Sequence, residues 1–195
     1  MQACRLAARD LACRRGDRLL FAGLALALEP GAALHVQGPN GVGKSSLLRI
    51  LAGLLPPFAG AVEREGAVAL LDERPALDPT LPLGRALHFW ERLDGRAADL
   101  AALGLAELID VPVRYLSTGQ KKRAALARLL GQDAPVWLLD EPLNGLDTFA
   151  VALVERLVAE HCAAGGICVV ASHQPFALAH ARALDLTGDL AGAAA

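Results

Sequence analysis

The sequence predicts an α/β fold with a mainly parallel sheet, an N-terminal antiparallel β ribbon and a helical subdomain. Two continuous apolar runs, VWLLD (136–140) and ICVVAS (167–172), are typical of strands that helices cover on both faces. Apolar residues at helical spacing continue from Leu83 to about Gly131 and predict the helical subdomain. LALAL (24–28) alternates with a period of two, as a half-buried strand does.

The first part of the chain supplies the ribbon and the start of the sheet. Residues 5–28 alternate loosely and predict an antiparallel ribbon that ends at the turn EPG (29–31). ALHVQ (33–37) is a short apolar candidate strand. SSLLRILAGLL (45–55) follows with leucines at the spacing of a helix, so a strand and a helix should flank residues 38–44.

The middle of the chain connects the ribbon to the helical subdomain. Two short strands are predicted around Ala61–Glu63 and Ala67–Leu71. The prolines of DERPALDPTLP (72–82) exclude regular structure in that stretch, and the helical subdomain at about 83–131 follows it. We therefore expect one domain over residues 1–195, with an alanine-rich tail that frays.

Composition and charge exclude several classes of protein. The longest apolar run, LLFAGLALAL (19–28), is far shorter than the roughly 20 residues that cross a bilayer, and no signal-peptide pattern opens the chain. We therefore expect a cytoplasmic protein. The net charge of −2 provides no basic field, so nucleic acid is not expected as a partner. The four cysteines show no metal-binding spacing and are expected to be small buried apolar residues.

GPNGVGKSS (38–46) contains the complete pattern of a phosphate-binding loop, between a predicted strand and a predicted helix. In such loops backbone N–H groups surround the phosphates, Lys44 reaches the outer phosphates, and the Ser45 hydroxyl binds Mg²⁺. The alternative is a glycine-rich turn that binds nothing. The residues predicted to contact the nucleotide here are Gly38, Pro39, Asn40, Gly41, Val42, Gly43, Lys44, Ser45 and Ser46.

Two acidic residues follow one another at the end of the predicted strand VWLLD. Asp140 is at the carboxyl end of the strand, where ligands of open α/β sheets bind, and is predicted to hold Mg²⁺ together with Ser45. Glu141 is next, in the position of a general base that orients and deprotonates the attacking water. The alternative is a strand end with two solvated acids.

LSTGQKKRAALARLL (116–130) predicts a helix whose N-terminus can face an anion. Ser117 can cap this helix, while Thr118, Gly119 and Gln120 leave its first turn open. The segment precedes the acidic strand, and LLDEPLNGLD (138–147) follows it. This order of motifs resembles the ABC-type ATPases along nearly the whole chain, which implies a P-loop NTPase fold of ABC type, with ATP and Mg²⁺ as cofactors.

The resemblance implies further site residues. It makes Ser117, Thr118, Gly119 and Gln120 the signature sequence, Asp147 the D-loop aspartate, and His173 the switch histidine. Lys44, Glu141 and His173 then form the expected catalytic set of an ATP hydrolase, although a lone surface histidine is the alternative for His173. In this family the signature completes the site of another copy, so the resemblance implies an ATP-bridged dimer of two copies of this chain.

Three positions depart from the family pattern. Arg74 stands where a glutamine usually contacts the metal or its water, and an arginine cannot ligate Mg²⁺. Arg14 or Arg15 stands where an aromatic residue commonly stacks on adenine, and a guanidinium plane would stack there more weakly. Thr118 replaces a glycine of the signature and leaves Gly119 in place.

Within the class, the short chain, ALHFW (86–90), the signature helix and SHQP (172–175) resemble ATP-binding subunits of haem-exporting cytochrome c maturation (Ccm) systems. The resemblance implies a peripheral subunit on the cytoplasmic face of the inner membrane. It implies integral membrane Ccm subunits as partners and no direct binding of haem, which agrees with the absence of C-x-x-C-H. The alternatives are the ATPase of another small exporter, a soluble assembly ATPase of the iron-sulfur type, or a regulatory nucleotide switch, which has no need of the signature.

Overall fold

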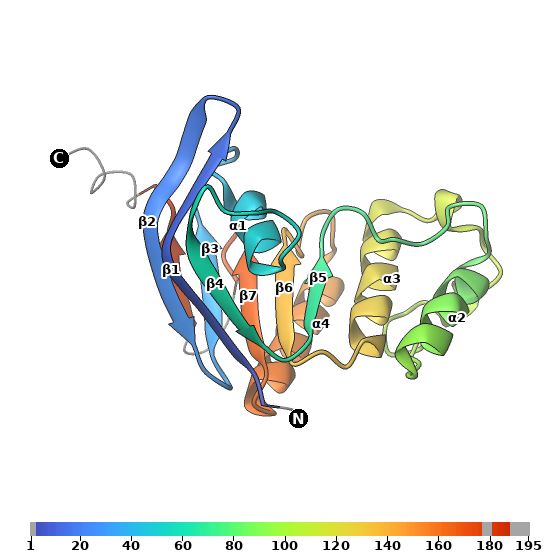
Figure 1. Cartoon of the computed structure of the whole chain (residues 1–195). Coiled ribbons are helices and arrows are strands. Elements are labelled where there is room, and N and C mark those ends of the chain that lie inside the picture. Colours follow the sequence, from blue (N-terminus) through green and yellow to red (C-terminus); the bar gives the residue numbers. More distant parts are fainter. Residues whose placement is uncertain (1–2, 177–180, 188–195) are drawn as a thin grey trace.

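Two β-sheets enclose helix α1 (Lys44–Leu51) in the computed structural model, which describes residues 3–176 and 181–187 (Figure 1). The smaller sheet is antiparallel, with the strand order β2-β1-β4. Its strands β1 (Arg5–Arg15) and β2 (Arg18–Leu28) form the predicted ribbon, which is confirmed, and β4 (Ala59–Glu65) pairs with the other side of β1. The alanine-rich tail that was expected to fray lies outside the described residues.

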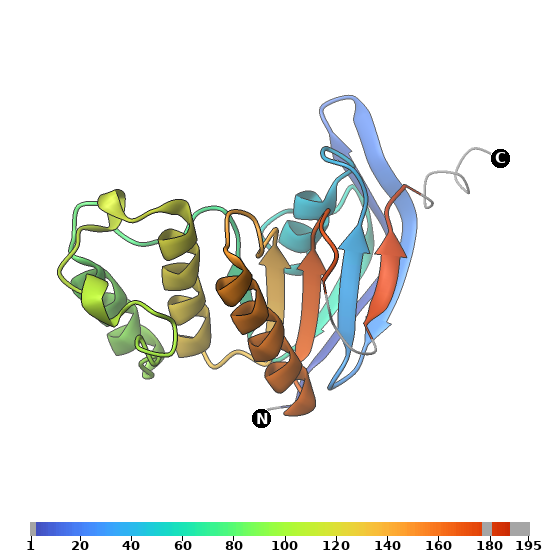
Figure 2. The ribbon, with the colours of Figure 1, turned by 180° about the vertical axis from the view of Figure 1, so that it is seen from behind.

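The larger sheet has five parallel strands in the order β5-β6-β7-β3-β8. The two central strands that the apolar runs predicted are buried along their whole length, because helices cover both faces of the sheet (Figures 1 and 2). The last strand among the described residues, β8, was not predicted. The strands are β3 (Ala33–Gln37), β5 (Val68–Leu71), β6 (Val136–Asp140), β7 (Ile167–Ala171) and β8 (Arg182–Asp185).

The two short strands predicted around Ala61–Glu63 and Ala67–Leu71 are present but belong to different sheets. β4 pairs with β1 in the antiparallel sheet, whereas β5 pairs with β6 in the parallel sheet. The chain passes from one sheet to the other at Gly66, whose φ of 89° favours glycine. The stretch of residues 72–82 contains no helix or strand, as its prolines predicted.

The helical subdomain is only partly helical. α2 (Leu83–Asp94) and α3 (Thr118–Gly131) are regular helices, and two 3₁₀ turns, at Ala106–Leu108 and Val113–Tyr115, lie between them. The helical pattern predicted from Leu83 to about Gly131 is wrong for the segment between α2 and α3, because Gly95 and Gly104 adopt left-handed conformations and Pro112 interrupts the segment. The leucines of this segment still pack into a core with α2 and α3.

α4 (Thr148–Ala163) covers the face of the parallel sheet opposite α1 (Figure 2). It was not predicted, although its buried residues recur at helical spacing. α1 ends at Leu51, before the predicted Leu55, because Gly53 has a φ of 79°. No helix in the described part of the chain is both long and apolar enough to cross a membrane.

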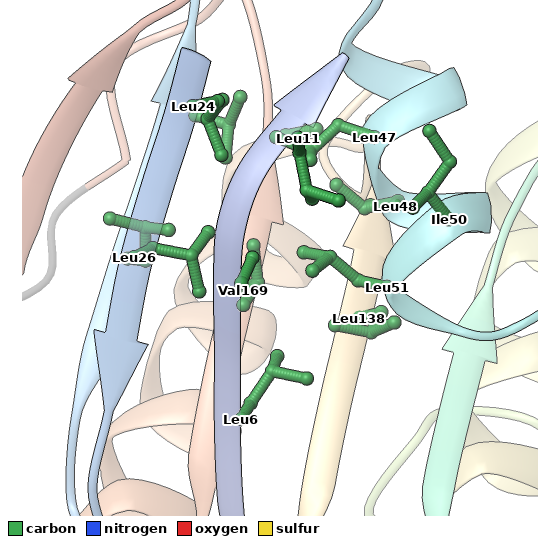
Figure 3. Close-up of a cluster of buried hydrophobic side chains, with 14 of the residues drawn as sticks. Leu6, Leu11, Leu24, Leu26, Leu47, Leu48, Ile50, Leu51, Leu138 and Val169 are labelled. Carbon is green, nitrogen blue, oxygen red and sulfur yellow. The ribbon is translucent and has the colours of Figure 1, made fainter. Parts of the chain in front are cut away.

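The main core lies between the two sheets and around α1. Leucines of the antiparallel sheet meet α1 and the inner face of the parallel sheet (Figure 3). The four cysteines are unpaired; Cys4, Cys13 and Cys168 are buried and Cys162 is half-buried, close to what the sequence predicted. The labelled residues of this core are Leu6, Leu11, Leu24, Leu26, Leu47, Leu48, Ile50, Leu51, Leu138 and Val169.

Candidate active site

The glycine-rich loop connects β3 to α1, so its backbone lies at the N-terminus of that helix. Gly43 is the residue before α1, and its φ of 118° places it in a region that side chains rarely adopt. A Cβ at Gly43 would lie 3.2 Å from Leu20 Cβ and from Phe21 Cδ1, in the buried ribbon. The conformation therefore favours glycine here, a side chain would press on Leu20 and Phe21, and the helix N-terminus that follows favours an anion.

A cavity of about 530 Å³ lies over this loop, which we call the phosphate-loop cavity. It opens at the carboxyl edge of the parallel sheet, where β6 and β7 end. Of the predicted residues, those lining it are Asn40, Gly41, Gly43, Lys44, Ser45, Ser46, Glu141 and His173. The lining residues that were not predicted are Arg18, Leu20, Glu73 and Asn144, and Arg15 lines it as well.

Three residues predicted in the loop do not line the cavity. The carbonyl oxygens of Gly38 and Pro39 accept hydrogen bonds from Lys44 Nζ and so hold that side chain in position. Val42 is buried, and a Cβ at Gly38 would lie 2.9 Å from its Cγ1. These residues shape the loop from beneath, which is a packing role.

Lys44 reaches across the loop toward the acidic strand end. Its Nζ donates to the carbonyl oxygens of Gly38 at 2.8 Å and Pro39 at 3.3 Å, and it lies 3.6 Å from Glu141 Oε1. The side chain is only 6% exposed. A buried ammonium beside a carboxylate and a row of backbone donors is suited to an outer phosphate.

Asp140 ends β6 beneath the same cavity and is 5% exposed. Burial raises the pKa of its carboxyl, and a hydrogen bond with Ser45 opposes that shift. Among the described residues, Asp140 Oδ1 has no hydrogen-bond partner. A buried carboxylate oxygen without a partner, next to a hydroxyl, fits Mg²⁺, which proteins hold with one or two carboxylates and the phosphates of a substrate.

Glu141 is held between the ends of two strands. Its φ of 46° is left-handed, which is uncommon for a residue other than glycine and is found at functional sites. His173 Nδ1 lies 2.9 Å from Glu141 Oε2, while Lys122 Nζ donates to the Glu141 carbonyl oxygen at 2.5 Å. The fold thus brings Lys44, Glu141 and His173 together at one end of the phosphate-loop cavity.

The predicted signature lies away from this cavity. Ser117 caps α3 by accepting from the backbone N–H of Gln120, whose side chain accepts from the Ser117 N–H. Thr118 contacts Gly145, since a Cβ on that glycine would lie 3.1 Å from Thr118 Cγ2. Asp147 caps α4 through a 2.8 Å bond from Ala150 N–H. Within one chain, neither the signature nor Asp147 lines the phosphate-loop cavity.

The structure shows where the arginines that depart from the family pattern lie. Arg74 is exposed and does not line the cavity, whereas its neighbour Glu73 does. The segment therefore presents a carboxylate at the site, which sequence reasoning missed because a loop without periodicity does not reveal which side chain faces inward. Arg14 places its guanidinium 4.4 Å from the centroid of the Phe58 ring, which leaves Arg15 at the cavity.

Comparisons with known proteins agree with this geometry. The profile of the ABC transporter family matches residues 21–144. Relatives named "Cytochrome c biogenesis ATP-binding export protein CcmA" include one from Novosphingobium aromaticivorans, 60% identical over 94% of this chain and 96% of the relative. Another, from Sphingopyxis alaskensis, is 55% identical over 89% of this chain and 91% of the relative.

Solved structures share the fold at lower identity. A putative ABC transporter ATP-binding protein from Pyrococcus furiosus has a TM-score of 0.80 and 22% identity, covering 95% of this chain and 99% of that one. An inward-facing conformation of a putative metal-chelate type ABC transporter has a TM-score of 0.78 and 23% identity, covering 94% of this chain and 80% of that one. The family profile and the sequence relatives lead to one conclusion: this chain belongs to the ABC transporter family.

Proposed function

We propose that this chain is the ATP-hydrolysing motor subunit of an export complex that serves cytochrome c biogenesis. The observation that carries the proposal is its 60% identity, along nearly the whole length of both chains, to a relative named as a cytochrome c biogenesis ATP-binding export protein. The convergence of Lys44, Glu141 and His173 over the phosphate loop supports the hydrolytic activity.

Binding of the triphosphate uses groups that are already in place. Backbone N–H groups at the start of α1 donate to the phosphate oxygens, and Lys44 exchanges the Gly38 and Pro39 carbonyl oxygens for phosphate oxygens. Ser45 and Asp140 are the residues that would hold Mg²⁺, which supplies charge neutralisation for the phosphates.

Hydrolysis requires a water molecule aligned with the γ-phosphate. Glu141 orients this water and accepts its proton through a carboxylate oxygen. His173 holds that carboxylate through its 2.9 Å contact, and the Lys122 hydrogen bond fixes the backbone beneath it. The role of these residues is therefore to align one water molecule beside Glu141, whose backbone has a left-handed φ of 46°.

The complete site needs a second copy of the chain. The N-terminus of α3, with Ser117, Thr118, Gly119 and Gln120, is free of the phosphate-loop cavity in one chain and is proposed to contact the nucleotide of the partner copy. Asp147 lies between the two sites in such a dimer. ATP closes the dimer, hydrolysis opens it, and the difference in affinity between the two states drives the attached subunits.

The attached subunits are proposed to be integral membrane Ccm proteins, which would hold this chain at the cytoplasmic face of the inner membrane. Haem delivery or release of the haem chaperone is the step that ATP drives, and haem does not bind this chain. The ATPase of another small exporter and a soluble assembly ATPase of the iron-sulfur type are the alternatives that the test must separate.

The test is a strain in which Lys44→Ala replaces the wild-type chain. We expect loss of c-type cytochromes, with haem and b-type cytochromes retained, because the motor no longer holds its nucleotide. Haem-stained gels measure the c-type proteins, and a strain with Arg156→Ala, an exposed residue of α4, is the matched control. Normal c-type cytochromes in the Lys44→Ala strain, at equal protein level, would contradict the proposed function.

A further inference from the structure

The sequence motif ALHFW (86–90) ends with Trp90, whose indole contacts two other parts of the helical subdomain. Its Nε1 donates to the Ala76 carbonyl oxygen at 2.9 Å, in residues 72–82, which we call the 72–82 segment and which lead from β5 to α2 (Figure 1). The guanidinium carbon of Arg128, on α3, lies 3.8 Å from the centroid of the Trp90 ring. One side chain of α2 therefore joins the 72–82 segment to α3.

The end of the 72–82 segment is fixed to the residues that lead into α3. Val113 N–H donates to the Leu81 carbonyl oxygen at 3.0 Å. Arg114 N–H donates to the Pro79 carbonyl oxygen, also at 3.0 Å. These backbone bonds make the end of the segment part of the helical subdomain.

The start of the 72–82 segment lies at the nucleotide site instead. Glu73, three residues before Ala76, lines the phosphate-loop cavity. Ala76 has a left-handed φ of 48°, a conformation that is uncommon for a residue with a side chain and persists where its surroundings fix it. The bond from Trp90 Nε1 is such a constraint, and it lies nearer to Glu73 along the chain than the bonds to residues 79 and 81 do.

The contact with Arg128 fixes the other side of the indole. Arg128 is half-buried, and its Nε has no hydrogen-bond partner in the part of the chain that the structure describes. A guanidinium in this state is stabilised by the face of an aromatic ring, and 3.8 Å is well within the range of that interaction. The position of the indole is therefore set by α3 as well as by α2.

We propose that Trp90 is a positioning residue for hydrolysis, which holds Glu73 in place relative to α3. The proposal rests on the proposed nucleotide-hydrolysing function. The Trp90 side chain does not line the phosphate-loop cavity among the described residues, so it acts through the 72–82 segment. Because α3 begins with the signature that is proposed to serve the partner copy, Trp90 links the segment at one nucleotide site to the helix that completes the other.

Nucleotide binding and hydrolysis should depend on this link to different degrees. The glycine-rich loop, Lys44 and Asp140 are placed by α1 and β6, so the affinity for ATP should not require the bond from Trp90. Alignment of the attacking water is more demanding, because small displacements of the groups around it slow the reaction. Glu73 brings a carboxylate into the same cavity as Glu141, so displacement of Glu73 should lower turnover.

The first test is Trp90→Phe, which keeps an aromatic ring for Arg128 and removes the N–H group that bonds Ala76. We expect turnover per ATP-binding site to fall by about tenfold, with ATP affinity unchanged. His88→Ala, which truncates a side chain 66% exposed on the same helix, is the matched control. A merely structural effect would remove binding sites and turnover in proportion. Equal turnover per site in the two variants would therefore overturn the proposal.

A double-variant cycle tests whether Trp90 acts through Glu73. Glu73→Ala removes the carboxylate that the 72–82 segment presents to the cavity. Adding Trp90→Phe to Glu73→Ala should then lower turnover per site by less than about twofold, because the two changes affect one interaction. A further loss as large as the one that Trp90→Phe causes in the wild type would overturn the proposal, since the residues would then act independently.

The fluorescence of Trp90 provides a readout that does not depend on activity. The sequence contains two tryptophans, so Trp137→Phe leaves Trp90 as the only one. Mg-ATP should change the emission of Trp90, because a nucleotide beside Glu73 displaces the segment that bonds the indole. Lys44→Ala in the same background controls for light absorbed by the nucleotide. Unchanged emission where equilibrium dialysis shows bound ATP would overturn the proposal, whereas absence of bound ATP from the wild type would contradict the proposed function itself.

Discussion

The two edges of the parallel sheet differ in whether their buried polar groups have hydrogen-bond partners. At the carboxyl edge, Asp140 Oδ1 is buried without a hydrogen-bond partner among the described residues, and Glu141 has a left-handed φ of 46°. At the amino edge, Trp137 stacks on His161 with ring centroids 3.9 Å apart, and His161 Nε2 lies 3.2 Å from the Pro135 carbonyl oxygen. Asp140 at one edge has a buried oxygen that a ligand can complete, whereas His161 at the other edge already has a partner within the chain.

The close approach of Gly166 to His161 adds to that contrast. A Cβ at Gly166 would lie 2.3 Å from His161 Nε2, so the loop before β7 contacts the imidazole directly. The energetic consequence is that residues at this edge should determine stability, whereas residues at the carboxyl edge should determine activity and contribute little to stability. The predictions below test this division.

The largest expected effect is on activity at the carboxyl edge. Glu141→Gln removes the carboxylate that accepts the proton of the attacking water, so ATP turnover should fall by about 10² to 10⁴. ATP binding should persist, because Lys44 and the loop remain. Phosphate release and ATP binding measured on the same preparation check both results. Turnover at the wild-type rate would show that Glu141 is not the general base.

The second effect is on stability at the amino edge. Trp137→Ala removes a side chain that is 5% exposed and stacked on His161, and should lower the free energy of unfolding by about 3–5 kcal/mol. Turnover per folded molecule should change little. Denaturant unfolding measures the loss, and Phe89→Ala, which truncates a side chain 61% exposed, is the control. A Trp137→Ala protein as stable as this control would contradict the division between the edges.

A smaller effect on activity is expected at Lys122, outside the phosphate-loop cavity. Lys122→Met retains the aliphatic length but cannot donate to the Glu141 carbonyl oxygen, so the carboxylate should be less well aligned. We expect turnover to fall by about tenfold with ATP affinity unchanged. Lys121→Met is the control, since Lys121 Nζ donates to Arg114 instead. Equal turnover in the two variants would show that Lys122 does not help to align Glu141.

The smallest effect is on the pH dependence of stability. Burial lowers the pKa of His161 below its ordinary value, so the folded state favours the neutral ring. Its contribution to stability is therefore complete above the unfolded pKa of about 6.5 and is lost as the pH falls below it. Unfolding free energies at pH 7.5 and 5.5 should differ less in His161→Phe than in the wild type. Burial also lowers the pKa of His35, so His35 should account for the pH dependence of stability that remains in His161→Phe.

Sequence reasoning succeeded where burial imposes a pattern. β6 and β7 are covered on both faces, so their continuous apolar runs identified them, and the strand-end positions of Asp140 and His173 followed. α4 also carries a periodic pattern, in Ala150, Leu153, Val154 and Val158, and could have been found from it. The irregular segment after α2 could not have been recognised from the sequence. Its leucines are buried although they lie on loops, and their spacing resembles that of a helix.

The site shows the same limit. Glu73 lies on a loop and Arg18 at the exposed start of β2, where no periodicity indicates which side chain faces the nucleotide. Arg14 and Arg15 could not be separated by sequence, because the Phe58 contact that occupies Arg14 depends on a segment distant in the chain. Tertiary placement of loops, rather than residue type, decided these cases.

The central claim is that the carboxyl edge favours activity at the expense of stability, and Asp140→Asn tests it most directly. Because burial raises the pKa of Asp140 in the folded state, its ionised form opposes folding at neutral pH. Without nucleotide at pH 7.5, the variant should have an unfolding free energy equal to or above that of the wild type, while ATP turnover is lost. An unfolding free energy lowered by as much as in Trp137→Ala would contradict the claim.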